Sequence, residues 1–248
     1  MRRGLILSNP MDRLEWRAPS RSVEVDISVL PSVVDVDAIV AHIAGLASGG
    51  ARFAAFFALI GLVGMRPSEV AGLEVADLTL PADGWGTARL RGAIPSPGTR
   101  YTDTAGTRDT KGLKHRPTGA VRSVPLPPDV VAMLRAHLER WPGVDGLVFT
   151  NANGRSVTAE NYGKVWNRTK AELWPAGHHL TGTKPYDLRH AAATSMLRAG
   201  VAPSEVARRL GHSVDVLLRV YAGVSRDESD RANRAIEAEF SRQRSVDR

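Results

Sequence analysis

Apolar residues recur along most of this chain with the spacing of α-helices. After Asp35, the side chains of Ile39, Val40 and Ile43 fall on one face of a helix that ends at Gly49-Gly50. The next segment, residues 51–63, is apolar on nearly every side, which predicts a central helix buried in the core. Further helices are predicted from Pro67, from Pro128 to about Arg140, and over residues 158–173, 186–198, 203–209, 214–221 and 227–242.

Strand-like alternation is confined to short segments. Residues 85–91 and 146–150 predict strands, and residues 92–110 are rich in Gly, Pro, Thr and Arg and predict a loop. Residues 111–126 predict a β-hairpin arm. The predicted fold class is therefore mainly α with a small antiparallel β-sheet.

The charge balance indicates a polyanionic partner. The chain has 33 Lys+Arg against 26 Asp+Glu, a net charge of +7. The surplus lies in residues 1–22, 108–122 and 184–219, as expected of a nucleic-acid groove built from separate segments. A soluble protein with surplus surface arginine is the alternative.

Composition also excludes several classes of protein. The chain has no cysteine, so disulfides, thiolate metal sites and cysteine nucleophiles are excluded. It has no uninterrupted apolar stretch of about 18 residues and no secretory signal, so we expect a cytoplasmic protein without a membrane partner.

Two arginines stand at predicted helix starts. Arg189 precedes the apolar positions Ala192, Ala193 and Met196, and Arg66 stands just before Pro67. Such a pair can form a bidentate phosphate clamp. The structural alternative is that each arginine pairs with a buried carboxylate, such as Glu69 or Asp187.

Two further candidates lie near the end of the basic region. His212 follows Gly211 at a helix break, and Tyr221 comes nine residues later. The segment 203–221 also reads as a helix-turn-helix, which would make the protein a DNA-binding regulator. That interpretation leaves Arg66 and the basic segment 111–116 unexplained.

These residues occur in motifs that together resemble those of a known family, the tyrosine recombinases or phage integrases, and in particular their actinobacterial members. The resemblance covers roughly residues 9–225. The matching segments are residues 64–69 with Leu73 and Asp77 (first arginine box), 186–190 (second arginine box), 210–212 and 219–222 (histidine and nucleophile boxes), and 102–104, 112–116 and 122–125 (active-site hairpin).

The resemblance implies a catalytic-domain fold of the DNA breaking-rejoining type and a specific chemistry. Tyr221 is the expected nucleophile, which attacks the scissile phosphate and forms a 3′-phosphotyrosine with release of a 5′-hydroxyl. Arg66 and Arg189 would stabilise the phosphate charge, His212 would hydrogen-bond it, and Lys114 would protonate the leaving oxygen, with Lys111 as the alternative. The bond energy is conserved, so no metal or other cofactor is expected.

Tyr186 departs from the family pattern, because the second box usually begins with His. A phenol with a reference pKa of about 10 is a poor base near neutral pH, although it can donate a hydrogen bond. The proton acceptor therefore stays open at this point.

The resemblance also sets expectations for domains and partners. Residues 1–31 are expected to be an interdomain linker after a missing core-binding domain, residues 32–225 the catalytic domain, and residues 226–248 a C-terminal helix. Double-stranded DNA and other protomers bound to it are the expected partners, with the last helix exchanged or folded back on its own domain. Integration or excision of a mobile element is the expected role; a type IB topoisomerase-like relaxase and the helix-turn-helix regulator are the alternatives.

Overall fold

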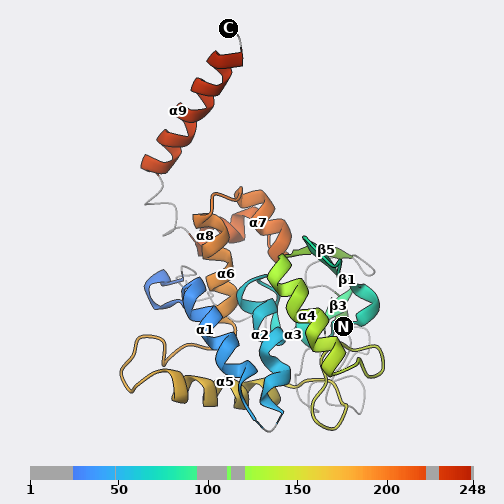
Figure 1. Cartoon of the computed structure of the whole chain (residues 1–248). Helices are drawn as coiled ribbons and strands as arrows, with labels where there is room; N and C mark the ends of the chain where they lie inside the picture. The colour runs from blue at the N-terminus through green and yellow to red at the C-terminus, as the bar shows by residue number, and fades with distance from the viewer. Residues whose placement is uncertain (1–24, 48, 94–110, 113–120, 222–228, 247–248) are drawn as a thin grey trace, which may run out of the picture.

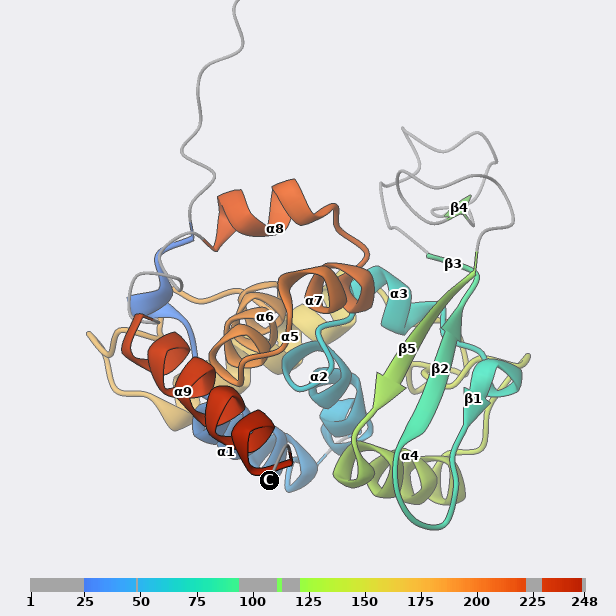
Figure 2. The same cartoon turned by 90° about the horizontal axis from the view of Figure 1, so that it is seen from above.

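The computed structural model describes residues 25–47, 49–93, 111–112, 121–221 and 229–246. Helices dominate this part of the chain, and a small sheet lies at one side of the helical body (Figures 1 and 2). The helices are α1 (Val33–Ala44), α2 (Ala54–Gly61), α3 (Pro67–Ala71), α4 (Pro128–Arg140), α5 (Ala159–Leu173), α6 (Asp187–Arg198), α7 (Pro203–Leu210), α8 (Val214–Val220) and α9 (Ser229–Val246), with short 3-10 turns at Ile27–Val29, Gly50–Phe53 and Val75–Asp77. The predicted fold class is confirmed.

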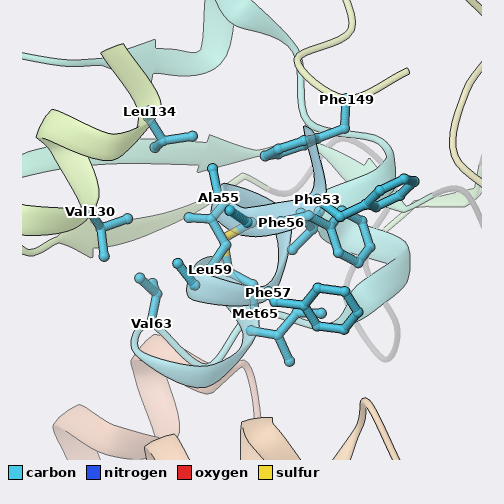
Figure 3. Close-up of a cluster of buried hydrophobic side chains, with 14 of the residues drawn as sticks. Phe53, Ala55, Phe56, Phe57, Leu59, Val63, Met65, Val130, Leu134 and Phe149 are labelled. Carbon is cyan, nitrogen blue, oxygen red and sulfur yellow. The ribbon is translucent and has the colours of Figure 1, made fainter. Parts of the chain in front are cut away.

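The apolar segment predicted over 51–63 forms the centre of the main core. It begins as a 3-10 turn and continues as α2, whose residues are all buried. In Figure 3, Val130 and Leu134 of α4 lie on one side of this helix and Phe149 lies across from its phenylalanines. The rings of Phe56 and Phe149 meet edge to face at 5.5 Å, a favoured aromatic geometry. This core fixes the C-terminal end of α2, from which the chain runs to Arg66.

A separate, smaller core joins α6, α7 and α8. Its buried members are Ala193, Val206, Ala207, Leu210, Leu217, Val220 and Tyr221. The two cores share the α6 region, where α2 and α6 are in contact.

The strands pair into two small antiparallel sheets, whose partners the sequence did not predict. β2 (Gly86–Leu90) pairs antiparallel with β1 (Leu78–Thr79) and β5 (Arg122–Leu126), whereas β4 (Lys111–Gly112) pairs with β3 (Gly92–Ala93). The described parts of the predicted 111–126 arm are therefore strands, and their partners are β3 and β2. Burial explains this pairing, because alternate residues of β2 and β5 both face the core.

Two smaller differences concern the ends of elements. No strand spans 146–150 within the described residues; Leu147 and Thr150 make isolated bridges with Glu74 and Ser156. The first helix begins at Val33 rather than Asp35, because Ser32 caps it. The Ser32 hydroxyl oxygen accepts from the Asp35 backbone N–H, and the Asp35 carboxylate accepts from the Ser32 backbone N–H.

Residues 27–44 reach the length and hydropathy of a membrane span, with a mean hydropathy of 1.7. An extended backbone at Leu30 and Ser32 interrupts the stretch, and α1 buries Val36, Ile39 and Ile43 in the core. This is weak evidence for a membrane span, because a core-facing helix has the same composition.

Candidate active site

The start of α3 holds Arg66 against Glu69. Pro67 occupies the first helical position, and the Glu69 carboxylate accepts a hydrogen bond from the Arg66 backbone N–H at 2.9 Å. The same carboxylate forms an ion pair with Arg66 Nη1 at 2.8 Å. The structural alternative considered for Arg66 is therefore correct as far as Glu69 is concerned.

Glu69 also forms ion pairs with two further guanidinium groups. Arg122, the first residue of β5, places Nη2 2.6 Å from Glu69 Oε1, and Arg189 Nη1 lies 3.9 Å from Oε2. Burial pushes the pKa of the Glu69 carboxyl upward, but the charges of Arg122, Arg66 and Arg189 outweigh it and hold this pKa below its ordinary value. The carboxylate is therefore charged, and three cations surround one anion.

Backbone carbonyl oxygens after α2 and at the C-terminal end of α7 accept further guanidinium N–H groups of Arg66 and Arg189. Arg189 donates to the carbonyl oxygens of Gly64 at 2.5 Å and Leu210 at 2.6 Å. Arg66 donates to those of Leu210 at 3.3 Å and Gly211 at 3.2 Å. Asp187, the other carboxylate considered, instead accepts from the Lys184 backbone N–H. The two arginines predicted as a pair are thus brought together by one helix end.

Burial has a clear effect on Arg189. Its side chain is completely buried, and burial together with nearby Arg66 lowers the pKa of its guanidinium to about 10. It remains cationic near neutral pH, where its charge is only partly offset by Glu69.

Two glycines shape this site. Gly64 has φ +82°, and a Cβ built there would lie 2.4 Å from Leu210 Cδ2. Gly211 has φ +68°, and this left-handed turn lets the His212 N–H bond back to the Ala207 carbonyl. The sequence Gly211-His212 therefore fixes where the histidine leaves α7.

His212 points its ring at Arg189. His212 Nε2 lies 2.9 Å from Arg189 Nη2, and since arginine only donates, Nε2 accepts and the ring proton sits on Nδ1. Burial, Arg189 and Arg66 lower the pKa of His212 to about 3, so the ring is neutral. Among the described residues, His212 Nδ1 and Arg189 Nε are buried without a hydrogen-bond partner. Both are donors, as an anion would require.

Tyr221 ends α8 within the same region. Its side chain is 1% exposed, and its hydroxyl lies 2.8 Å from Nδ1 of His190, the residue after Arg189. Burial raises the pKa of the Tyr221 phenol above its ordinary value. Tyr186 is 40% exposed, and its ring meets that of His190 edge to face at 5.2 Å.

The structure brings together most of the predicted site residues. Arg66 and Arg189 donate to the same carbonyl oxygen of Leu210, and Arg189 also bonds to His212. His190 connects Tyr221 to the same segment of α6. Lys114 lies outside the described residues. Of its alternative, Lys111, only the position in β4 is described.

Two residues of the site, Arg122 and His190, were not assigned a role from the sequence, although both stand inside recognised motifs. The position of Arg122 at the end of a basic segment and of His190 directly after Arg189 were the available signals. Neither signal says which partner the side chain meets.

Comparison with known proteins shows the family of this chain. The sequence profile of the phage integrase family matches residues 33–228, and the chain belongs to this family. A tyrosine recombinase XerC-like protein of Caldanaerobacter subterraneus is 26% identical over 195 residues, which are 71% of this chain and 46% of that protein. Tyrosine recombinase XerD of Lacticaseibacillus casei is 26% identical over 231 residues, 91% of this chain and 67% of that protein. The chain thus corresponds to about half to two thirds of the length of these relatives.

The fold has counterparts among solved structures. The Tn1549 transposon integrase, solved in complex with transposon right end DNA, superposes with a TM-score of 0.66 at 20% sequence identity, covering 82% of this chain and 66% of that one. At this level of identity the comparison establishes the fold of the catalytic domain.

Proposed function

We propose that this chain is the catalytic part of a site-specific DNA recombinase, which cuts and rejoins strands through a 3′-phosphotyrosine in the integration or excision of a mobile element. Tyr221 is the nucleophile. Arg66 and Arg189 stabilise the charge on the non-bridging phosphate oxygens, and His212 donates a hydrogen bond to them from Nδ1. The substrate is double-stranded DNA.

The surplus of buried positive charge carries this proposal. Among the described residues, Arg66 and Arg189 share the carboxylate of Glu69, to which Arg122 is also paired, so the guanidinium groups of Arg66 and Arg189 alone already outnumber it. Buried charges need a counter-ion, and a phosphodiester supplies one negative charge at the moment of binding and a second as the transition state develops. The unpartnered donors in the same place would bond such an anion.

The names of the relatives and neighbours agree with this reading. Both relatives are called tyrosine recombinases, and the Tn1549 integrase was solved with DNA. We carry the activity over to this chain as a proposal, together with a linker at 1–31, a catalytic domain at 32–225 and a C-terminal helix and tail at 226–248. A DNA-acting protein of this kind works in the cytoplasm, at the nucleoid.

Lys114 is the proposed acid for the leaving 5′-oxygen, with Lys111 as the alternative, and Tyr186 is proposed to act as a hydrogen-bond donor toward the phosphate. No cofactor is assigned, because the phosphotyrosine bond retains the energy needed for rejoining.

The last helix is the proposed contact between protomers on DNA. α9 stands apart from the rest of the described chain in Figure 1, and Ile236 and Phe240, four positions apart, are each about half exposed. An exposed apolar pair on one helix face favours docking on another surface. Sedimentation with and without DNA, for the wild type and Phe240→Glu, tests whether α9 supports assembly.

Covalent trapping tests the proposed chemistry. The substrate is a pool of random-sequence duplexes, each nicked so that a short cleaved fragment diffuses away and strands the enzyme on DNA. Wild type should form a denaturation-resistant adduct and Tyr221→Phe should form none. Tyr162→Phe, the same change at a tyrosine that stacks on Phe56 in the core, should keep the adduct. Absence of the wild-type adduct would leave the DNA-binding regulator as the better interpretation. Relaxation of supercoiled plasmid without strand exchange between duplexes would favour the topoisomerase-like alternative.

A further inference from the structure

The proposed nucleophile needs a group that takes its proton. Tyr221 is buried and its phenol has a raised pKa, so it stays protonated until a base removes the proton. Tyr186, at the position where the family usually has His, is another phenol and is 40% exposed. Histidine is the side chain that most often serves as a general base in proteins.

The hydrogen bond from Tyr221 identifies a different group. We propose, on the basis of the proposed function, that His190 Nδ1 accepts the proton of the Tyr221 hydroxyl as its oxygen attacks the DNA phosphate, which makes His190 a catalytic residue. The two atoms lie 2.8 Å apart, within the range for proton transfer along a hydrogen bond.

The surroundings of His190 hold its ring in this position. The Tyr186 ring meets it edge to face at 5.2 Å, and the Tyr221 ring lies at 5.8 Å. His190 follows Arg189, whose guanidinium is fixed by two carbonyl oxygens and bonded to His212. The base is therefore built on the same turn of α6 as a phosphate-binding arginine.

The charges around His190 favour its neutral form. Burial lowers the pKa of the imidazole, Asp187 on the same helix raises it, and Arg189 lowers it again, with a net fall below the ordinary value. The other titratable groups that face it are Tyr186, Tyr221 and the neutral His212. A neutral ring with Nδ1 unprotonated is the form that accepts a proton.

The step balances as two coupled transfers. The proton of Tyr221 moves to His190 Nδ1, the phenolic oxygen forms the new P–O bond, and the bond from phosphorus to the 5′-oxygen breaks. That oxygen takes a proton from the general acid, for which Lys114 is proposed. Rejoining runs in reverse, with the His190 imidazolium returning its proton to the departing Tyr221 oxygen.

The variant His190→Asn tests whether His190 acts by accepting a proton or only by holding Tyr221 in position. The Asn amide can reach the place of Nδ1 and keep a hydrogen bond to Tyr221 but cannot take a proton. The assay is the single-turnover rate of adduct formation with the nicked duplex pool, with total DNA bound measured in parallel. We expect a rate lower by about 10²–10⁴ at neutral pH with unchanged binding. His179→Asn, an exposed histidine, is the matched control.

The pH profile and chemical rescue distinguish a general base from a residue that only supports the structure, because a purely structural role of His190 would change neither of them. The wild-type rate should fall in acid as His190 becomes protonated and level off near neutral pH. The His190→Asn rate should rise about tenfold per pH unit, in proportion to the phenolate fraction of Tyr221. A polyfluorinated tyrosine at position 221, with a more acidic phenol, should restore His190→Asn by about tenfold or more and change the wild type little.

Failure of the proposed role of His190 and failure of the proposed function give different results in these experiments. A His190→Asn variant that cleaves at the wild-type rate, or a slow one that neither follows pH nor responds to the fluorinated tyrosine, overturns the assignment of the base and leaves the proposed function standing. A wild-type chain that forms no adduct overturns the proposed function and this role of His190 with it.

Discussion

Removing the charge of Glu69 is the most demanding test of the site's electrostatics. Glu69→Gln keeps the size of the side chain and one hydrogen-bond acceptor, so it creates no cavity. It removes the counter-charge from Arg122 at 2.6 Å, Arg66 at 2.8 Å and Arg189 at 3.9 Å. The side chains of Arg122 and Arg189 are 2% and 0% exposed, so both cations lose this counter-charge inside the protein, where water cannot replace it.

The expected cost follows from that burial. Breaking a buried ion pair by removing one partner costs about 3–5 kcal/mol, a large share of a total stability of about 5–15 kcal/mol. For a chain of this size each kcal/mol shifts Tm by about 2–4 °C, so Tm should fall by about 6–20 °C. Added sulfate should recover more of this loss in the variant than it adds to the wild type, because the anion can replace the missing charge.

The pH dependence has a definite sign. The pKa of Glu69 in the folded protein lies below the ordinary value of 4.5. The carboxylate therefore contributes stability that is fully present above that ordinary value and is lost as the pH falls through the lowered one. Glu69→Gln lacks this contribution, so wild type and variant should converge in stability as the pH is lowered into this range.

Glu205→Gln is the matched control, because it removes the charge of a carboxylate that is partly exposed to solvent. Glu205 also pairs with two arginines, Arg208 at 2.6 Å and Arg209 at 2.7 Å, but its side chain is 33% exposed. Its loss should cost less than about 1 kcal/mol. Thermal and urea unfolding measure both variants. A cost below about 1 kcal/mol at Glu69 as well would refute the argument that the three guanidinium groups depend on this carboxylate.

Three further changes test other parts of the site. Arg66→Ala should slow adduct formation by about 10²–10³ and weaken DNA binding much less, as measured by single-turnover trapping and fluorescence anisotropy. Gly64→Ala should lower Tm by more than Gly84→Ala, since both glycines have positive φ but only Gly64 would clash with a neighbour; equal losses would mean that the neighbour yields freely. Lys114→Ala should regain cleavage of a duplex with a 5′-bridging phosphorothiolate, whose sulfur leaves without a proton; rescue of Lys111→Ala instead would reassign the acid.

Hydrophobic periodicity was sufficient to predict most of the helices. The segments 158–173, 186–198 and 203–209 match α5, α6 and α7 to within a residue at each end. These ends carry local signals, such as Thr158, which caps α5 with its side chain, and Gly211, which takes the left-handed turn after α7. Signals that act within one turn of the chain can be recognised without the fold.

Pairing between distant segments was harder to predict. Val121 to Leu126 alternates as a strand does, but the sequence did not predict its partner: β5 pairs with β2, because the core buries alternate residues of both strands. Arg122 reaches Glu69 only as a result of that pairing. Its role could not be predicted from its neighbours in the sequence, since they do not determine which strand lies beside it.

The position of His190 shows the same limit at shorter range. The sequence shows that His190 directly follows Arg189. The proposed role of its side chain, however, depends on a contact with Tyr221, which lies 31 residues further along the chain. That contact depends on α7 and α8 folding back over α6 around Leu210 and Leu217. The motif predicted which residues gather, and the packing of the smaller core decides which atoms meet.

Ion pairing and phosphate binding therefore coexist at this site. Glu69 orients the guanidinium groups of Arg66 and Arg122 and compensates one charge, while carbonyl oxygens of Gly64 and Leu210 fix Arg189 without neutralising it. Carbonyl dipoles can direct a cation but cannot cancel its net charge. A rigid cluster of guanidinium groups around the carboxylate of Glu69 is organised before the substrate arrives, and a bound anion would stabilise it further. Preorganised charge of this kind favours a transition state that gains negative charge over a ground state that carries less.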